Sequence, residues 1–89
     1  MIINSFDWDE INTEHIARHD VTPDEVEEVF DQRYLLFRTR DERYLAIGKS
    51  YDGRFVTVIF EKIKDGIRVV TARDTDYKER KLYKRKTGK

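Results

Sequence analysis

The sequence predicts a single α+β domain over residues 1–89, with two N-terminal helices, a four-stranded antiparallel meander sheet and a C-terminal helix. Three observations lead to this fold class. Two helix-start signals precede residue 31, four runs rich in β-branched and aromatic residues follow, and capping chemistry returns at Asp76. A chain of 89 residues folds around one modest core, because a domain of this size leaves much of its surface in water.

The first helix is expected to run to about residue 18, with Asp7 as its N-cap and Glu10 as the acidic partner three positions later. Its buried stripe is expected to contain Trp8, Ile11, His15, Ile16 and His19. The two histidines have the spacing of metal ligands, but no third ligand can be nominated. We therefore interpret them as structural residues in or beside the core and expect no metal site.

The second helix begins with clearer signals. Thr22 is a suitable N-cap, Pro23 occupies the first helical position, and Glu25 can reach back to the cap. Val21 and Val26 are spaced to pack against each other across the helix start. Only a short link separates the two helices, so they should be neighbours.

Four runs then favour strands, at residues 34–37, 43–50, 54–62 and 67–73. The dipeptides Asp52-Gly53 and Asp65-Gly66 are typical of tight hairpin turns, so the strands should pair in sequential order. The third run is apolar on both faces, which predicts the central strand, with the acidic helices covering one face.

The last helix is expected over residues 77–85, capped by Asp76 and Glu79. It has few apolar anchors but six cations in nine positions: Lys78, Arg80, Lys81, Lys84, Arg85 and Lys86. A solvated face and a phosphate-binding surface are both compatible with this pattern, because each cation that neutralises a phosphate adds affinity. Tyr77 and Tyr83 among the cations could stack on unpaired bases.

The net charge of zero conceals a division between the two ends of the chain. Up to residue 31 there are ten acidic residues and one basic residue, a charge of −9, and the remainder carries +9. This division is compatible with two faces that serve different partners, one of them a polyanion, and also with a solvated surface whose two halves attract each other. Cysteine is absent, no apolar run is long enough for a membrane span, and the N-terminus lacks signal-peptide features, so we expect a cytoplasmic protein.

Four stretches carry a family resemblance that covers nearly the whole chain: FDWDE, HIARHDVTPDEVEEVF, RYLAIGKSYDGR and IRVVTARDTDYKERKLYKR. The most specific features are Arg18-His19-Asp20-Val21 before the Thr22 to Glu25 helix start, and Ala72-Arg73 followed by Glu79-Arg80 and Tyr83. In this order and spacing they resemble BrnT, a toxin family of the RelE-like superfamily of bacterial toxin–antitoxin modules.

The resemblance implies a RelE-like fold and a ribonuclease that blocks translation without a metal ion or another cofactor. It implies attack of a ribose 2′-hydroxyl on the adjacent phosphate, with cations on the open sheet face stabilising the added charge. It also implies a cognate antitoxin, expected to be of the ribbon-helix-helix type, that neutralises the toxin in a hetero-oligomer. This chain would then reach DNA only indirectly, through the antitoxin.

The basic pattern of the family also implies the functional residues. Arg68 and Arg73 are expected to stabilise the transition state, and Arg80 to position the phosphate. Glu79 is either a helix cap or a weak general base, and its place three residues after Asp76 favours the cap. The further contacts expected with RNA come from Arg54, Lys62, Tyr83 and Lys84.

Two classes of function stay open on the sequence alone. One is the RNA-cutting toxin. The other is a non-catalytic protein-binding module with a degenerate toxin fold. In that case the acidic helices, a sheet edge and the weakly anchored last helix would serve an antitoxin-like partner.

Overall fold

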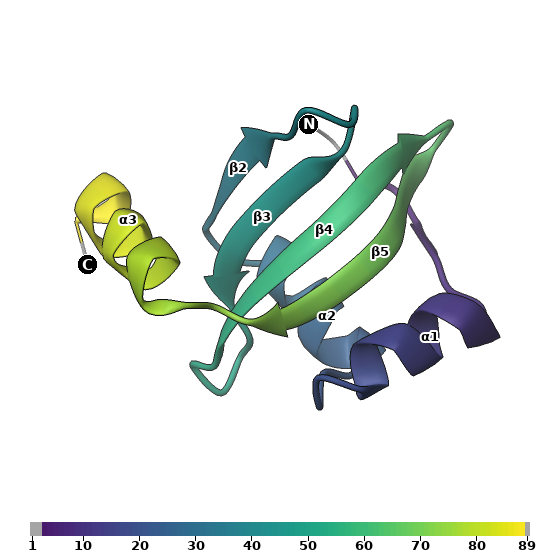
Figure 1. Ribbon diagram of the computed structural model, residues 1–89, viewed down its shortest axis with the longest axis horizontal. Coiled ribbons are helices and arrows are strands. Elements are labelled where there is room, and N and C mark those ends of the chain that lie inside the picture. Colours follow the sequence, from purple (N-terminus) through teal and green to yellow (C-terminus); the bar gives the residue numbers. More distant parts are fainter. Residues whose placement is uncertain (1–2, 89) are drawn as a thin grey trace.

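The computed structural model describes residues 3–88 and confirms the α+β class. Its elements in chain order are β1 (Phe6–Asp7), α1 (Glu10–Ala17), α2 (Pro23–Phe30), β2 (Tyr34–Arg38), β3 (Tyr44–Lys49), β4 (Phe55–Ile63), β5 (Gly66–Asp74) and α3 (Tyr77–Thr87). Figure 1 shows the twisted sheet between the two N-terminal helices and α3. None of the helices among the described residues is long and apolar enough to cross a membrane.

The sheet has five strands in the order β1-β5-β4-β3-β2. Strands β2 to β5 form the expected antiparallel meander, and β4 is central as predicted. The prediction of four antiparallel strands was nevertheless wrong, because β1 adds a parallel edge strand beside β5. Asp7 therefore lies in an extended strand opposite Arg68 and cannot start a helix.

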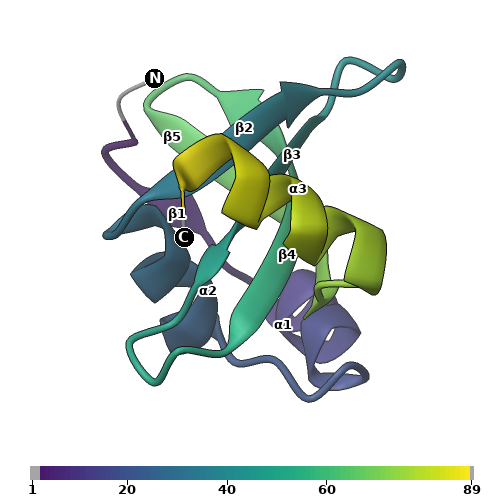
Figure 2. The ribbon, with the colours of Figure 1, turned by 90° about the vertical axis from the view of Figure 1, so that its left-hand side faces the viewer.

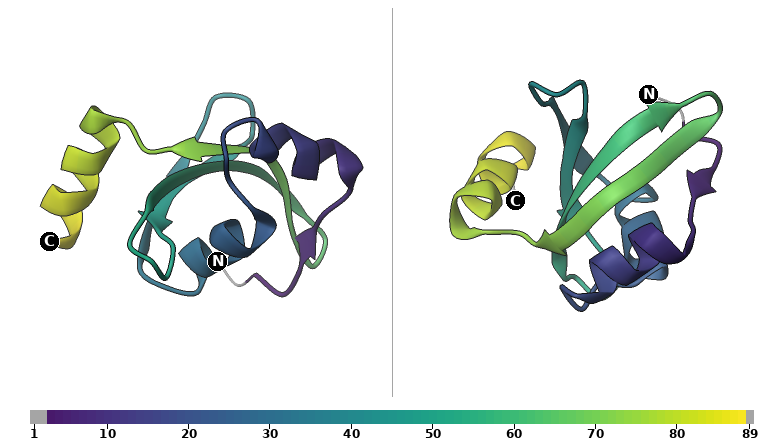
Figure 3. Two further views of the ribbon diagram at one scale, coloured as in Figure 1. Left: turned by 90° about the horizontal axis from the view of Figure 1, so that it is seen from below. Right: turned by 45° about the vertical axis from the view of Figure 1, so that its right-hand side comes forward.

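The main core lies between the sheet and the two N-terminal helices. Val58 and Phe60 of β4 pack there with Val26 and Val29 of α2 and with Ile16 of α1, all fully buried. Figure 3 shows the sheet curving around α2, with α3 outside the arch. Figure 2 shows α3 crossing the opposite face of the sheet, where it contacts β2 and β3. The acidic helices cover one face of the sheet, as the sequence predicted.

The N-cap of helix α1 lies two residues later than expected. Asp9 is the N-cap and Asn12 completes a reciprocal capping box, replacing the predicted pair Asp7 and Glu10. Asn12 is almost fully buried, and its side-chain amide donates to the backbone oxygens of Asp7 and Val69. This one side chain therefore ties α1 to β1 and to β5.

The later start changes which face of α1 meets the core. Asn12 and Ile16, four residues apart, point inward, whereas Ile11 is 73% exposed. His15 and His19 are also exposed, so the predicted stripe was wrong for Ile11 and for both histidines. Ile16 is fully buried and Trp8 packs against the core, as expected. Within residues 3–88, no cluster of three or more His, Cys, Asp or Glu residues has an arrangement suited to a metal ion.

The other two helix starts are confirmed. Thr22 and Glu25 form the capping box of α2, and Asp76 and Glu79 form that of α3. Helix α3 continues to Thr87 and ends at Gly88 in the left-handed conformation (φ 76°), beyond the expected residue 85.

The two predicted hairpin turns differ in what their glycines do. Gly53 has φ 84°, as a tight turn between β3 and β4 requires. In the second hairpin, Lys64 and Asp65 form the turn and Gly66 is already the first residue of β5. A Cβ atom at Gly66 would overlap the carbonyl oxygen of Ser5. Gly66 is therefore needed for the close approach of the segment that leads into β1.

Candidate functional site

A β-bulge decides where two of the predicted arginines point. Arg73 pairs with Thr57 and Arg68 pairs with Glu61, and the register shifts between them. Because five residues separate the arginines, a regular strand would direct them to opposite faces. The shift directs both arginines to the face that carries α3. Their pairing partners on β4 are four residues apart, so the two arginines are separated by roughly 13 Å along the sheet.

Arg73 and Glu79 form the most closely organised charged group on this face. Arg73 donates from Nη1 and Nη2 to the two carboxylate oxygens of Glu79, at 2.8 and 2.9 Å. Thr57 Oγ1 donates to Glu79 Oε1 at 3.0 Å. Because the single hydroxyl proton of Thr57 is used in this way, Thr75 must donate the 2.9 Å bond between the two threonine hydroxyls. This network holds Arg73 in one orientation at the end of β5.

Electrostatics keep the Glu79 carboxyl ionised. Burial is the largest single influence and acts to raise its pKa, but hydrogen bonds from Arg73, the Asp76 backbone and Thr57 outweigh it and lower the pKa. The pKa of Arg73 is raised, chiefly by the hydrogen bond to Glu79. The backbone N–H of Asp76 donates to Glu79, and the Glu79 backbone donates to Asp76, so the cap interpretation of Glu79 is confirmed.

Arg80 and an unpredicted lysine stand beside this group. The guanidinium carbon of Arg80 and the Nζ atom of Lys49 each lie 4.9 Å from the centre of the Phe55 ring. Lys49 faces Phe55 across the β3–β4 ladder. Tyr83 packs its ring edge-on against the same phenylalanine, at 5.4 Å between centroids. One aromatic side chain therefore holds two cations close together and also anchors α3.

Arg68 lies at the other end of the same strand and is engaged by two carboxylates. Its Nη1 atom is 3.1 Å from Asp7 and 2.9 Å from Asp9. The pKa of Asp9 is lowered, first by the backbone N–H of Asn12 and then by Arg68. Arg68 thus ties β1 and the α1 cap to β5. The predicted convergence of Arg68 with Arg73 is limited to a shared face of the sheet.

Arg54, which was expected to contact RNA, instead joins several elements of the fold. Its guanidinium donates to the carboxylates of Glu25 and Asp74 and to the backbone oxygens of His19 and Asp20. These acceptors belong to α2, the end of β5 and the link between the two N-terminal helices. The hydrogen bonds raise the pKa of Arg54, first through Asp74. Arg54 therefore has a structural position.

The remaining predicted contacts are divided between the faces. Lys62 pairs with the fully buried Ile67 and so belongs to the helix-covered face, away from Arg73. Tyr83 is only 6% exposed, and its hydroxyl donates to the backbone oxygen of Arg33, so its ring is unavailable for base stacking. Lys84 is exposed on α3, and Tyr77 is 74% exposed there. The structure therefore gathers Arg73, Glu79, Arg80 and Lys84 around α3.

Sequence reasoning missed Lys49 and the two threonines. Lys49 ends β3 directly before the Ser50 to Arg54 turn, and Phe55 begins β4 directly after it. The Asp52-Gly53 signal that predicted this hairpin also fixes Lys49 opposite Phe55, so the register alone could have found the lysine. Thr57 and Thr75 gave no comparable signal, because their role depends on where α3 starts.

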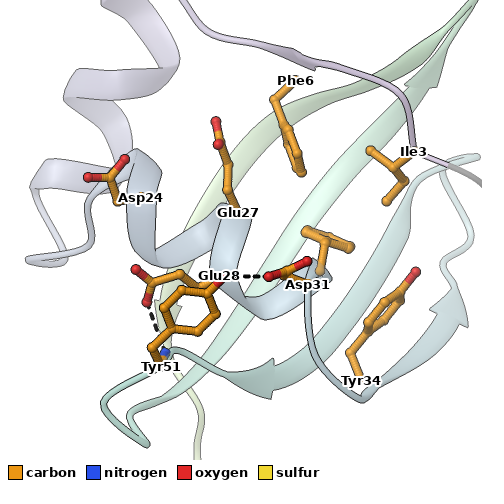
Figure 4. A pocket seen from close by; sticks show the side chains of 9 residues that line it. Ile3, Phe6, Asp24, Glu27, Glu28, Asp31, Tyr34 and Tyr51 are labelled. Carbon is orange, nitrogen blue, oxygen red and sulfur yellow. Dashed lines mark hydrogen bonds between the residues drawn. The ribbon is translucent and has the colours of Figure 1, made fainter.

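A second feature lies on the helix-covered side of the molecule. An open depression of about 430 Å³ is bordered by the carboxylates of Asp24, Glu27, Glu28 and Asp31 and by the side chains of Ile3, Phe6, Phe30, Tyr34 and Tyr51. Figure 4 shows Tyr51 bonded through its backbone to Glu28 and through its hydroxyl to Asp31. The bond to Asp31 raises the pKa of the Tyr51 phenol. The depression combines negative charge with exposed aromatic surface.

Comparison with known proteins identifies the family. The model of the ribonuclease toxin BrnT, of type II toxin–antitoxin systems, matches residues 8–79. This match covers most of the chain, and the protein belongs to the BrnT family. The crystal structure of the Brucella abortus ribonuclease toxin BrnT superposes with a TM-score of 0.62 and 26% sequence identity, covering 78% of this chain and 92% of that one. No match is found among proteins with curated descriptions.

Proposed function

We propose that this protein cuts RNA on the sheet face beside α3, with Arg73 and Arg80 as the groups that contact the reacting phosphate. One observation carries the proposal. Glu79 fixes the orientation of Arg73. Arg80 is the residue directly after Glu79 and lies at the edge of the same sheet face. Because the chain belongs to a ribonuclease toxin family, RNA cleavage is the reaction that we assign to this arrangement.

The proposed reaction needs no bound metal ion. The 2′-oxygen of a ribose forms a bond to the adjacent phosphorus, and the bond from phosphorus to the 5′-oxygen of the next nucleotide breaks. The 2′-hydroxyl proton passes to solvent, and the leaving 5′-oxygen takes a proton from solvent. The products are a 2′,3′-cyclic phosphate and a 5′-hydroxyl. The phosphorane-like transition state carries extra negative charge, which pre-oriented guanidinium groups stabilise.

Glu79 acts in this scheme as a positioning residue. Its carboxylate accepts hydrogen bonds from Arg73, Thr57 and the Asp76 backbone, and its lowered pKa makes it a weak base. We therefore assign it the orientation of Arg73 rather than proton abstraction. A general-base role for Glu79 would require the carboxylate to exchange Arg73 for the 2′-hydroxyl.

The family also supports a partner protein. A type II toxin family implies an antitoxin. We propose that a ribbon-helix-helix antitoxin neutralises this chain in a hetero-oligomer within the cytoplasm and provides its only link to DNA. Coexpression with a candidate ribbon-helix-helix antitoxin, followed by purification, tests whether a complex forms.

The direct test of cleavage uses the purified protein and end-labelled single-stranded RNA in excess chelator. We expect fragments with 2′,3′-cyclic phosphate ends, at a rate that falls strongly in R80Q. Arg40 provides a matched control because it is exposed in the β2–β3 loop, so R40Q should cut like the wild type. Absence of cleavage in all preparations, or equal loss in both variants, would contradict the proposal.

A second function is favoured by the acidic depression on α2. Four carboxylates beside the exposed ring of Tyr51 suit a cationic protein segment, whereas they repel RNA. In a non-catalytic member of the family, this surface would hold an antitoxin-like partner. The variant D24K/E27K should abolish capture of the coexpressed partner if the surface is used. Retained capture, together with RNA cleavage, would remove this candidate.

A further inference from the structure

Two cations share one aromatic ring at the edge of the sheet. Lys49 Nζ and the Arg80 guanidinium carbon are each 4.9 Å from the centre of Phe55, so they are at most 9.8 Å apart. The described residues supply neither cation with a carboxylate partner within salt-bridge distance. An anion bound beside this ring would be attracted by both cations.

A hollow adjoins Lys49, one member of this pair. It has a volume of about 260 Å³ and is lined by Gln32, Arg33, Lys49 and Tyr83. Gln32 closes one side by donating to the backbone oxygen of Lys49 at 2.9 Å, and the Tyr83 hydroxyl donates to the backbone oxygen of Arg33. Among the residues that the structure describes, no acidic side chain lines the hollow. Its size suits a phosphate with part of its ribose better than a larger ligand.

The hollow and Lys49 lie on the same sheet face as Arg73. Phe55 and Thr57 are alternate residues of β4 on one face, and Thr57 bonds to the same carboxylate that orients Arg73. A continuous path therefore runs from the Arg73–Glu79 group past Arg80 and Phe55 to Lys49.

We propose that Lys49, with the hollow beside it, binds a backbone phosphate of single-stranded RNA next to the reacting phosphate that Arg73 and Arg80 contact. This inference rests on the proposed function and names Lys49 as a substrate-positioning residue. It replaces Lys62 and Arg54, which the fold directs elsewhere.

The test separates binding from cleavage. A fluorescein-labelled single-stranded RNA with 2′-fluoro riboses lacks the nucleophile, so its anisotropy reports binding alone across a series of KCl concentrations. The variants are K49Q, K49R and K64Q, in which Lys64 is an exposed lysine of the distant β4–β5 turn. We expect K49Q to weaken binding roughly 3- to 10-fold at low salt and to reduce the slope of log affinity against log salt by about 0.7. K49R and K64Q should keep the wild-type slope.

Thermal unfolding of each variant shows whether the fold is intact, and unmodified RNA assayed in parallel reports cleavage. If the wild type cuts RNA but K49Q keeps the slope of K64Q, the phosphate site is overturned and the proposed function survives. If the slope depends on Lys49 but the wild type does not cut, the site is supported and cleavage is overturned. A wild type without affinity for the 2′-fluoro RNA overturns the site directly.

Discussion

Arg73 and Glu79 are joined by two parallel hydrogen bonds of 2.8 and 2.9 Å, across the junction between the last strand and the last helix. Glu79 is at the same time the third residue of the α3 capping box. The start of the helix and the orientation of the arginine are therefore set by one carboxylate. A change at Glu79 should affect stability and RNA cleavage together.

Stability should depend on Glu79 only above acid pH. Because its pKa is lowered in the folded protein, its contribution is fully present above the unfolded-state pKa of about 4.3 and is lost as pH falls through the folded value. We expect E79Q to lower the unfolding free energy by about 1–2 kcal/mol at neutral pH. Urea denaturation at several pH values measures this. A deficit that stays constant from neutral to strongly acid pH would contradict the assignment.

Cleavage should accelerate with pH across the neutral range. The chain contains only two histidines, both exposed, and neither is a hydrogen-bond partner of Arg73 or Glu79 among the described residues. With Glu79 ionised throughout, the rate constant should rise about tenfold per pH unit between roughly pH 6 and 8, as the 2′-hydroxyl loses its proton to solvent base. Single-turnover cleavage of labelled RNA gives this profile. A bell-shaped curve would instead indicate a titrating side chain in the site.

Arg54 should matter for stability rather than for RNA. Its planar guanidinium donates hydrogen bonds to acceptors on separate elements of the fold, and a lysine ammonium group cannot form the same set of bonds. Both R54K and R54M should therefore lower the unfolding free energy by about 2 kcal/mol or more. RNA affinity per folded molecule should stay at the wild-type level, as measured by anisotropy on protein kept well below its melting temperature. A stable R54K with reduced affinity would restore the RNA-binding assignment.

Gly66 and Gly53 offer a paired test of the β1 edge strand. Alanine at Gly66 would collide with the Ser5 backbone, whereas alanine at Gly53 meets open space and is strained only by φ 84°. We expect G66A to cost about 2 kcal/mol or more and G53A about 1 kcal/mol. Hydrogen exchange in G66A should also show loss of protection at Ile67, whose N–H donates to Ser5. Equal, small effects would mean that β1 is not firmly docked.

Local chemistry explains which parts of the fold the sequence could predict. The caps at Thr22 and Asp76 and the turn at Gly53 act within a few residues, so their signals are complete in the sequence. Strand β1 is only two residues long and pairs with Ile67 and Arg68, about sixty positions later. Such a short pairing has no periodicity of its own. Its omission also displaced the predicted cap from Asp9 to Asp7.

The site was less predictable because the use of an arginine depends on its neighbours in space. Arg54, Arg68 and Arg73 all bond to carboxylates, and only in Arg73 does the partner belong to the adjoining helix. The bulge that turns Arg68 and Arg73 to one face leaves no mark in the strand composition. Lys49 could have been found from the hairpin register, which places it opposite Phe55, but the approach of Arg80 to the same ring depends on where α3 lies.

The central claim is that the reacting phosphate lies at Arg73 and not at Arg68. Single-turnover cleavage of labelled RNA in chelator, corrected for the folded fraction, compares R73Q with R68Q. We predict that R73Q is slowed about 100-fold or more, as expected for a group that stabilises transition-state charge, while R68Q stays within about threefold of the wild type. An R68Q variant as slow as R73Q, or an R73Q variant that cuts at the wild-type rate, would contradict it.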